Sequence, residues 1–499
     1  MDILGNLVMG FGVALSPVNV ALCLVGALVG TLIGVLPGIG PIATIAMLLP
    51  LTFSLNATGA LIMLAGIYYG AQYGGSTTAI LVNMPGETSS VVTTLDGHQM
   101  ARQGKAGKAL GVAALGSFFA GCVATLVIAV LGPILSRVAQ AFGPPEYCAL
   151  MVVGLVAATV LASGSVFKAI TMTLVGLLLG TVGSDVETGA QRLTFEIPEL
   201  ADGIGFTSLA IGLFGIAEII RNLEAPEVRG VVGTRIAGLL PNWADIKQCI
   251  APVLRGTVLG SILGILPGNG AVLAPYASYT VEKKLAKDPS RFGRGAIEGV
   301  AGPESANNAG AQTSFIPLLT LGIPPNAVMA LMVGAMTIQG IIPGPQVMTK
   351  NPELFWGMVA SMLVGNAMLV IINLPLIGLW VRLLKVPYRL LFPAILLFCC
   401  IGVFSVNSSY VDVLLVALFG LVGYALVKLE FEPAPLLLAF VLGPLFEENL
   451  RRAFLISRGD PMIFVERPIS LTLLVVAAGL LLVMLLPSVR HTREEAFHG

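Results

Sequence analysis

Two stretches of the sequence decide the fold: GTLIGVLPGIGP at residues 30–41 and GSILGILPGNGA at residues 260–271. They lie 230 positions apart, and each places Pro-Gly-x-Gly inside a strongly apolar segment. Because proline and glycine interrupt helices, each apolar segment is expected to break at this point. Helices broken at corresponding positions in two halves of a chain are typical of substrate sites in secondary transporters. The pair therefore favours a membrane transport protein.

The composition is that of an integral membrane protein. Of 499 residues, 56% are hydrophobic and only 11% are charged, with a mean hydropathy of +0.92. A helix that spans a bilayer needs about 20 largely apolar residues. The apolar stretches that meet or approach this length are residues 18–36, 109–131, 147–161, 166–182, 204–220, 358–384, 390–406, 411–427 and 469–486. The sequence predicts an all-α integral membrane protein with about 11–12 membrane segments, including broken or re-entrant helices.

Further matches between the halves extend the repeat. GGSTTAILVNMPG (residues 74–86) resembles GAQTSFIPLLTLGIPP (residues 310–325), with three extra residues in the second copy. Two more matches keep the same order: Pro144 with Pro387, and Glu218 and Arg221 with Glu448 and Arg451. The (i, i+3) spacing of each Glu and Arg favours helix-end ion pairs. These matches divide the chain into an N-terminal interfacial segment (1–17), repeat 1 (18–225), a linker (226–250), repeat 2 (251–465) and a C-terminal membrane helix with its tail (466–499).

The loop charges indicate that the two repeats are inverted. Basic residues cluster at 102–108 in the first repeat, whereas the equivalent loop of the second repeat, 343–352, contains only Lys350. Conversely, residues 283–294 carry five basic residues, and the equivalent loop at 52–58 has none. Cytoplasmic loops carry the excess of Lys and Arg, so non-equivalent loops are expected to face the cytoplasm. Lys428 and the pair Arg451 and Arg452 do not follow this pattern.

Each break can bind ions through its backbone. The half-helix after the turn offers free N–H groups and a positive dipole end to a carboxylate, and carbonyls before the turn suit a bare cation. The expected substrate contacts at the breaks are Gly38, Gly40, Gly268, Asn269 and Gly270. A sodium ion is expected near Pro37, Gly38, Pro267, Gly268 and Asn308. The alternative is that these glycines and prolines only kink the helices.

Polar side chains flank both breaks. The candidate substrate-binding residues among them are Ser76, Thr77, Thr78, Asn83, Asn307, Asn308, Thr313 and Ser314. Hydroxyls and amides can bind a carboxylate or sodium without a buried charge, but they also hold membrane helices together. Glu304 is an acid in or near the membrane, where such residues are usually functional. No basic residue lies in these polar strings, so an anion would have to be balanced by backbone N–H groups and sodium.

Other chemistries find no support in the sequence. The chain has no GxxxxGK[ST], HExxH or GxSxG motif, so neither a built-in ATPase nor a hydrolase is expected. The net charge is zero, which gives no reason to expect a nucleic acid partner. Six cysteines without CxxC spacing are expected to be small core residues rather than metal ligands. We expect no enzyme activity and no cofactor other than sodium as the coupling ion.

Four strings resemble a known family: GVLPGIGP (34–41), YGGSTTAILVNMPGE (73–87), GPESANNAGAQTSFIPLLTLGIPPN (302–326) and GPLFEENLRRAF (443–454). They closely resemble the large membrane subunit of bacterial tripartite tricarboxylate transporters, the TctA family. The resemblance covers nearly the whole chain and directs attention to the same glycines and polar residues at the breaks. One departure is Asn269-Gly270-Ala271, where the first copy has Ile39-Gly40-Pro41, so the two breaks need not bind alike.

The resemblance implies a multi-pass protein of the bacterial inner membrane. It implies two partners, a small membrane subunit of about four helices and a periplasmic solute-binding protein, and import of a di- or tricarboxylate such as citrate driven by an ion gradient, usually sodium. Two alternatives remain open: a stand-alone organic-anion exchanger, and a structural membrane subunit that transports nothing.

Overall fold

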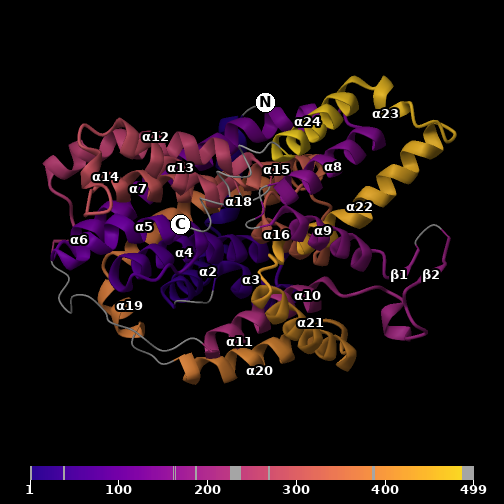
Figure 1. The fold of residues 1–499 in the computed structure, drawn as a ribbon, viewed down its shortest axis with the longest axis horizontal. Coiled ribbons are helices and arrows are strands. Elements are labelled where there is room, and N and C mark those ends of the chain that lie inside the picture. The colour runs from indigo at the N-terminus through magenta and orange to yellow at the C-terminus, as the bar shows by residue number, and fades with distance from the viewer. Residues whose placement is uncertain are drawn as a thin grey trace.

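The computed structural model describes residues 3–36, 40–160, 162, 165–185, 188–224, 238–267, 270–384 and 388–485 (Figure 1). Within these ranges the regular secondary structure is helical apart from two short antiparallel strands, β1 (Gly183–Ser184) and β2 (Gln191–Arg192). The expected all-α architecture is therefore confirmed.

The helices of the first half run from the N-terminus to residue 224. They are α1 (Ile3–Ala14), α2 (Pro17–Val35), α3 (Pro41–Leu48), η1 (Leu49–Ser54), α4 (Ala57–Val82), η2 (Thr88–Ser90), α5 (Val91–Thr93), η3 (Thr94–His98), α6 (Gln99–Arg102), α7 (Ala106–Ala139), α8 (Pro144–Val160), α9 (Val166–Gly180), η4 (Pro198–Leu200), α10 (Phe206–Ala210), η5 (Ile211–Ile216) and α11 (Ala217–Glu224).

The helices of the second half begin at residue 243. They are α12 (Trp243–Ile265), α13 (Gly270–Leu285), η6 (Pro289–Arg291), α14 (Glu298–Thr313), α15 (Phe315–Leu321), α16 (Ala327–Ile338), α17 (Pro345–Lys350), α18 (Pro352–Asn373), α19 (Ile377–Leu383), α20 (Tyr388–Asn407), α21 (Tyr410–Lys428), α22 (Ala434–Ile456), α23 (Ile463–Glu466) and α24 (Pro468–Leu485).

Six helices of the described chain are long and apolar enough to cross a membrane: Pro17–Val35, Ala106–Ala139, Phe206–Glu224, Trp243–Ile265, Pro352–Asn373 and Tyr410–Lys428. Large apolar side chains are exposed along them, for example Leu126 on α7, Ile262 on α12 and Leu418 on α21. Such surfaces suit lipid rather than water. The protein is thus a multi-pass membrane protein. The expected total of 11–12 segments stays a prediction, because several further apolar helices, among them Pro144–Val160 and Val166–Gly180, have fewer than 18 residues.

Both helix interruptions occur where the Pro-Gly-x-Gly turns predict them. Helix α2 ends at Val35 and α3 begins at Pro41, while α12 ends at Ile265 and α13 begins at Gly270. The residue after each first helix is extended: Leu36 has φ −84° and ψ 106°, and Leu266 has φ −72° and ψ 130°. The turn residues Pro37, Gly38, Gly268 and Asn269 lie outside the described residues.

Glycines spaced by four bring each broken helix against a polar partner helix. A Cβ atom at any of them would lie 2.2–2.4 Å from a backbone oxygen of the partner, so only glycine fits. The pairs are Gly26 with Met63, Gly30 with Ile67 and Gly34 with Ala71 between α2 and α4, and Gly256 with Gly302, Gly260 with Ala306 and Gly264 with Gly310 between α12 and α14. The same contact is therefore built twice.

This packing also fixes which residues of the two halves are equivalent. The glycines of α2 and α12 are 230 positions apart, but their partners in α4 and α14 are 239 apart. Ala71 therefore occupies the place of Gly310, whereas the sequence match aligns Gly74 with Gly310. The two alignments differ by three residues because the sequence match pairs one glycine with another. The packing instead pairs the residues whose backbone carbonyls contact equivalent glycines.

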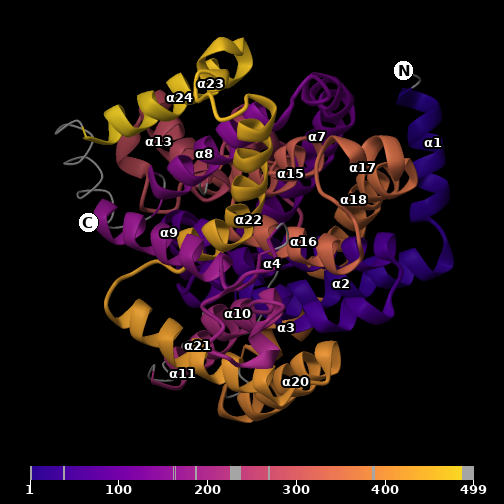
Figure 2. The same ribbon diagram turned by 90° about the vertical axis from the view of Figure 1, so that its right-hand side faces the viewer.

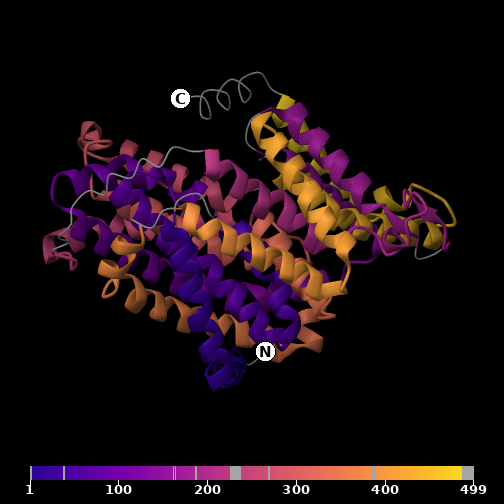
Figure 3. The ribbon, with the colours of Figure 1, turned by 90° about the horizontal axis from the view of Figure 1, so that it is seen from below.

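The two halves interlock rather than lie side by side. Helix α7 of the first half packs on α14 of the second, and α18 of the second half packs on α4 of the first. The last helices of each half also pack on the other half. Helix α22 packs on α8 and α9, and η5 and α11 pack on α21 (Figures 1 and 2). Figure 3 shows the magenta and yellow group that contains α8, α9, α22 and α24 projecting from the rest of the molecule.

The two basic loops lie at the same end of the molecule. The side-chain amide of Gln103 donates to the carbonyl of Arg294 at 2.7 Å. Asp96, fully buried, accepts backbone N–H bonds of 2.7–2.9 Å from Gly293, Gly295 and Ala296. Non-equivalent basic loops are thus held together, as inverted repeats require. The inversion itself stays a prediction.

The first test concerns this topology. Single cysteines replacing Lys105 and Lys287, both exposed, are expected to resist an impermeant thiol reagent added to intact cells that carry the protein without its native cysteines. Both should become reactive when the membrane is permeabilised. Labelling of either residue from outside would contradict the inverted arrangement.

The second test concerns the glycine contacts. We expect Gly260→Val to abolish recovery of monodisperse protein in size-exclusion chromatography, because its Cβ would lie 2.2 Å from the Ala306 oxygen, and overpacking against backbone cannot relax. Gly479→Val in α24 is the control, since no atom lies within 4 Å of that Cβ position. Equal recovery of the two variants would show that the contact is not essential.

Candidate functional site

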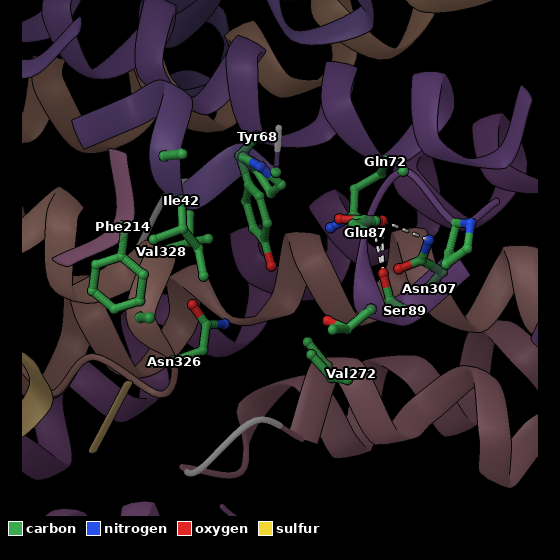
Figure 4. A pocket seen from close by; sticks show the side chains of 18 of the residues that line it. Ile42, Tyr68, Gln72, Glu87, Ser89, Phe214, Val272, Asn307, Asn326 and Val328 are labelled. Carbon is green, nitrogen blue, oxygen red and sulfur yellow. Dashed lines mark hydrogen bonds between the residues drawn. The ribbon is translucent and has the colours of Figure 1, made fainter. Parts of the chain in front are cut away.

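A cavity of about 340 Å³ lies between the two breaks. It is lined by the first residues of α3 and α13, by α4, by the loop that follows α4, and by the first residues of α16 (Figure 4). Its labelled side chains are Ile42, Tyr68, Gln72, Glu87, Ser89, Phe214, Val272, Asn307, Asn326 and Val328. Elements of both halves therefore form one site.

Three helix N-termini meet at this cavity. Gly40 and Pro41 line it at the start of α3, Ala271 and Val272 at the start of α13, and Asn326 at the start of α16. The Asn326 side chain caps α16 by accepting from the Met329 N–H at 2.9 Å. The first turn of a helix presents unpaired N–H groups and the positive end of its dipole. Three such ends around one cavity suit an anion.

A polar network crosses the cavity wall from one half to the other. Glu87 Oε1 accepts from Ser89 Oγ at 2.6 Å and from Asn307 Nδ2 at 3.3 Å. Ser89 Oγ also lies 3.1 Å from Gln72 Oε1. Glu87 and Asn307 come from different halves, so the network links the loop after α4 to α14. These groups provide donors and acceptors for a polar ligand.

One basic side chain, Arg221, is found among the residues that line the cavity. It forms a 2.6 Å ion pair with Glu218, and both residues belong to the lining. The ion pair agrees with the sequence interpretation. The strings beside the breaks contain no basic residue, but α11 brings Arg221 to the cavity from the end of the first half. No local sequence signal predicts this approach.

Several residues predicted from sequence lie at one of two cavities. Gly40 and Asn307 line the cavity, and Gly270 precedes the lining residue Ala271. Ser76 and Thr77 line a second, much smaller cavity together with Glu304. Gln72, Glu87, Ser89 and Asn326 complete the larger site.

The remaining predicted residues have partners elsewhere. Thr78 Oγ1 donates to the Val35 carbonyl at 2.8 Å, at the end of α2, and Asn83 is the exposed C-cap residue of α4, with φ 60°.

Asn308 donates to Ser117 Oγ at 2.7 Å, and neither it nor Pro267 is among the lining residues. The hydroxyls of Thr313 and Ser314 donate to carbonyls of their own helix, Ala309 and Ala311. The geometry therefore favours Asn307 over Asn308 as a contact to a ligand in the larger cavity.

These features define an integral membrane protein with an anion-suited cavity at paired helix breaks. The model of the tripartite tricarboxylate transporter TctA family matches residues 20–438, so the chain belongs to the TctA family. This is a family of transporters, and the chain is accordingly a membrane subunit of a tricarboxylate transporter.

Two relatives from Agrobacterium vitis are similar over long stretches. One, described as an uncharacterized 52.8 kDa protein in the TAR-I ttuC' 3' region, is 60% identical over 497 residues, which cover 100% of this chain and 99% of the relative. The other, an uncharacterized protein in the TAR-II ttuC' 3' region, is 61% identical over 238 residues, which cover 48% of this chain and 98% of the relative. No solved structure matches the chain.

Proposed function

We propose that this chain is the large permease subunit of a binding-protein-dependent secondary transporter that imports a di- or tricarboxylate, citrate-like in chemistry, driven by a sodium gradient. The observation that carries the proposal is the convergence of three helix N-termini on one cavity between the halves. The N–H groups at the start of a helix stabilise a bound carboxylate without the need for a charged side chain.

The size and lining of the cavity support a small organic acid. A volume of about 340 Å³ is close to the lower end of ligand pockets, roughly 300–1,000 Å³. Arg221 adds a guanidinium, which can bind a carboxylate with two parallel N–H bonds. Glu87 and Glu218 would repel further anionic groups near them. Together these features favour an acid with separated carboxylates.

The proposal includes a place in a larger assembly. A small membrane subunit of about four helices and a periplasmic solute-binding protein would complete the transporter in the bacterial inner membrane. The binding protein would deliver the acid to the outward-facing state, and sodium moving down its gradient would drive release inside. Family membership and the apolar helices support this assembly.

Uptake into proteoliposomes tests the proposal. The chain is reconstituted with a candidate small membrane subunit and a candidate solute-binding protein from the same organism, and uptake of labelled citrate, succinate and malate is measured. We expect uptake only with an inward sodium gradient and both partners. Uptake that instead requires an internal counter-anion would indicate an exchanger, and no uptake of any tested acid would favour a structural subunit.

Arg221 provides a test of the site. We expect Arg221→Gln to raise the KM for the transported acid at least tenfold, with a smaller change in kcat, because it removes a charged contact present before and during transport. Arg452→Gln is the matched control, since Arg452 is an exposed arginine paired with Glu448 outside the cavity lining. Equal KM values for both variants would remove Arg221 from the site.

A further inference from the structure

Glu304 is a buried carboxylate without a basic partner. It lies in α14 with 1% of its surface exposed. One carboxylate oxygen accepts from Ser76 Oγ at 2.5 Å, and the other accepts from Thr93 Oγ1. No Lys, Arg or His of the described chain forms an ion pair with it. Two hydroxyl donors do not neutralise a charge at this depth, and unpaired charges inside a membrane protein are costly.

The same carboxylate lines a small cavity that is distinct from the larger one. This cavity measures about 10 Å³, which is room for one particle the size of a water molecule. Its polar lining consists of Tyr73, Ser76, Thr77, Ser117, Glu304 and Asn373. These residues come from α4 and α7 of the first half and from α14 and α18 of the second, so any occupant would join the halves.

Two oxygen atoms of this lining have no hydrogen-bond partner within the described chain. They are the hydroxyl oxygen of Tyr73 and the side-chain carbonyl oxygen of Asn373, and each residue is only 4% exposed. The Asn373 amide nitrogen is already used, since it donates to the Leu369 carbonyl at 2.9 Å. A buried acceptor without a donor destabilises the fold. A cation would satisfy both oxygens.

We infer that Glu304, Tyr73, Ser76 and Asn373 bind one dehydrated sodium ion. The ligands are all hard oxygens, which suit alkali and alkaline-earth cations. A single positive charge neutralises the single carboxylate, whereas Mg²⁺ would leave an excess charge and usually keeps several waters, for which this cavity has no room. The coupling ion of the proposed function, on which this inference rests, is thereby assigned to the site between the halves. It is not assigned to the carbonyls at the breaks.

The site is placed to link ion binding to the first break. Ser76 binds Glu304, and Thr78, two residues further along α4, donates to the carbonyl of Val35 where α2 ends. A change in the position of this part of α4 would therefore reach the break directly. This provides a physical route between the small cavity and the start of α3.

Sodium binding to purified protein tests the inference. Binding of ²²Na⁺ to the detergent-solubilised chain, without any carboxylate, is measured with choline replacing sodium. We expect one saturable site, with affinity at least tenfold weaker in Glu304→Gln. Glu146→Gln is the matched control and should bind as the wild type, because Glu146 is an equally buried carboxylate that has its own partner, Arg467, at 3.3 Å.

Two further variants cover the case in which Glu304→Gln does not give monodisperse protein. Ser76→Ala and Asn373→Leu keep the carboxylate and each remove one sodium ligand, so both should weaken sodium binding at least tenfold. Unchanged binding in these variants, unchanged binding in Glu304→Gln, or no sodium binding by the wild type would overturn the inference. A site that responds only to protons would overturn it as well.

The transport assay separates this inference from the proposed function. Uptake that remains sodium-dependent in Glu304→Gln would overturn the ion site and leave the proposed function intact. Absence of uptake in the wild type together with sodium binding lost in Glu304→Gln would support the ion site while contradicting the proposed function.

Discussion

The close contact of each broken helix with its polar partner is the constraint on which the rest of the structure depends. Three glycines on α2 and three on α12 let the backbones approach so closely that no Cβ atom fits between them. Without this approach the ends of α2 and α12 could not lie beside α4 and α14. Thr78 then satisfies carbonyls at the end of α2, where a helix break in a membrane would otherwise leave them unpaired. Packing and hydrogen bonding thus hold the break in one place.

Because the two halves interlock, the two contacts between a broken helix and its polar partner contribute to a single site. Because α7 packs on α14 and α18 on α4, each polar helix is covered by the other half and is shielded from lipid. This allows α4 and α14 to carry polar residues such as Gln72, Ser76, Glu304 and Asn307 in a membrane protein. The larger cavity then receives the positive ends of α3, α13 and α16, and the smaller cavity receives the carboxylate of Glu304. The proposed anion and cation sites share the helices α4 and α14, so that binding at one can influence the other.

The sequence predicted the parts that depend on local chemistry. Pro-Gly-x-Gly predicts the two interruptions because those residues cannot continue a helix, and apolar composition predicts the membrane class. Gly40 is predicted because it belongs to a break, and Asn307 because it belongs to a polar run in an otherwise apolar chain; both line the larger cavity. The glycine contacts were missed, although their signal is present as glycine at every fourth residue, 26, 30 and 34, repeated at 256, 260 and 264.

Other features could not be predicted because they arise from contacts between distant segments. Arg221 reaches the larger cavity from α11, and Asn373 lines the smaller cavity from α18; neither has a neighbour in sequence that indicates its role. Asn308 illustrates the same limit, since adjacent amides in a helix point in different directions. Asn307 meets Glu87 at the larger cavity, whereas Asn308 meets Ser117. Sequence alone could not decide between them.

An experimental structure of the chain with its small subunit, in sodium and a saturating concentration of a carboxylate that supports uptake, tests the central claim most directly. We expect ligand density in the larger cavity, with carboxylate oxygens at the starts of α3 or α13 and within reach of Asn307. Ligand density at a position that contacts neither break, with this cavity empty, would contradict the claim that the paired breaks form the substrate site.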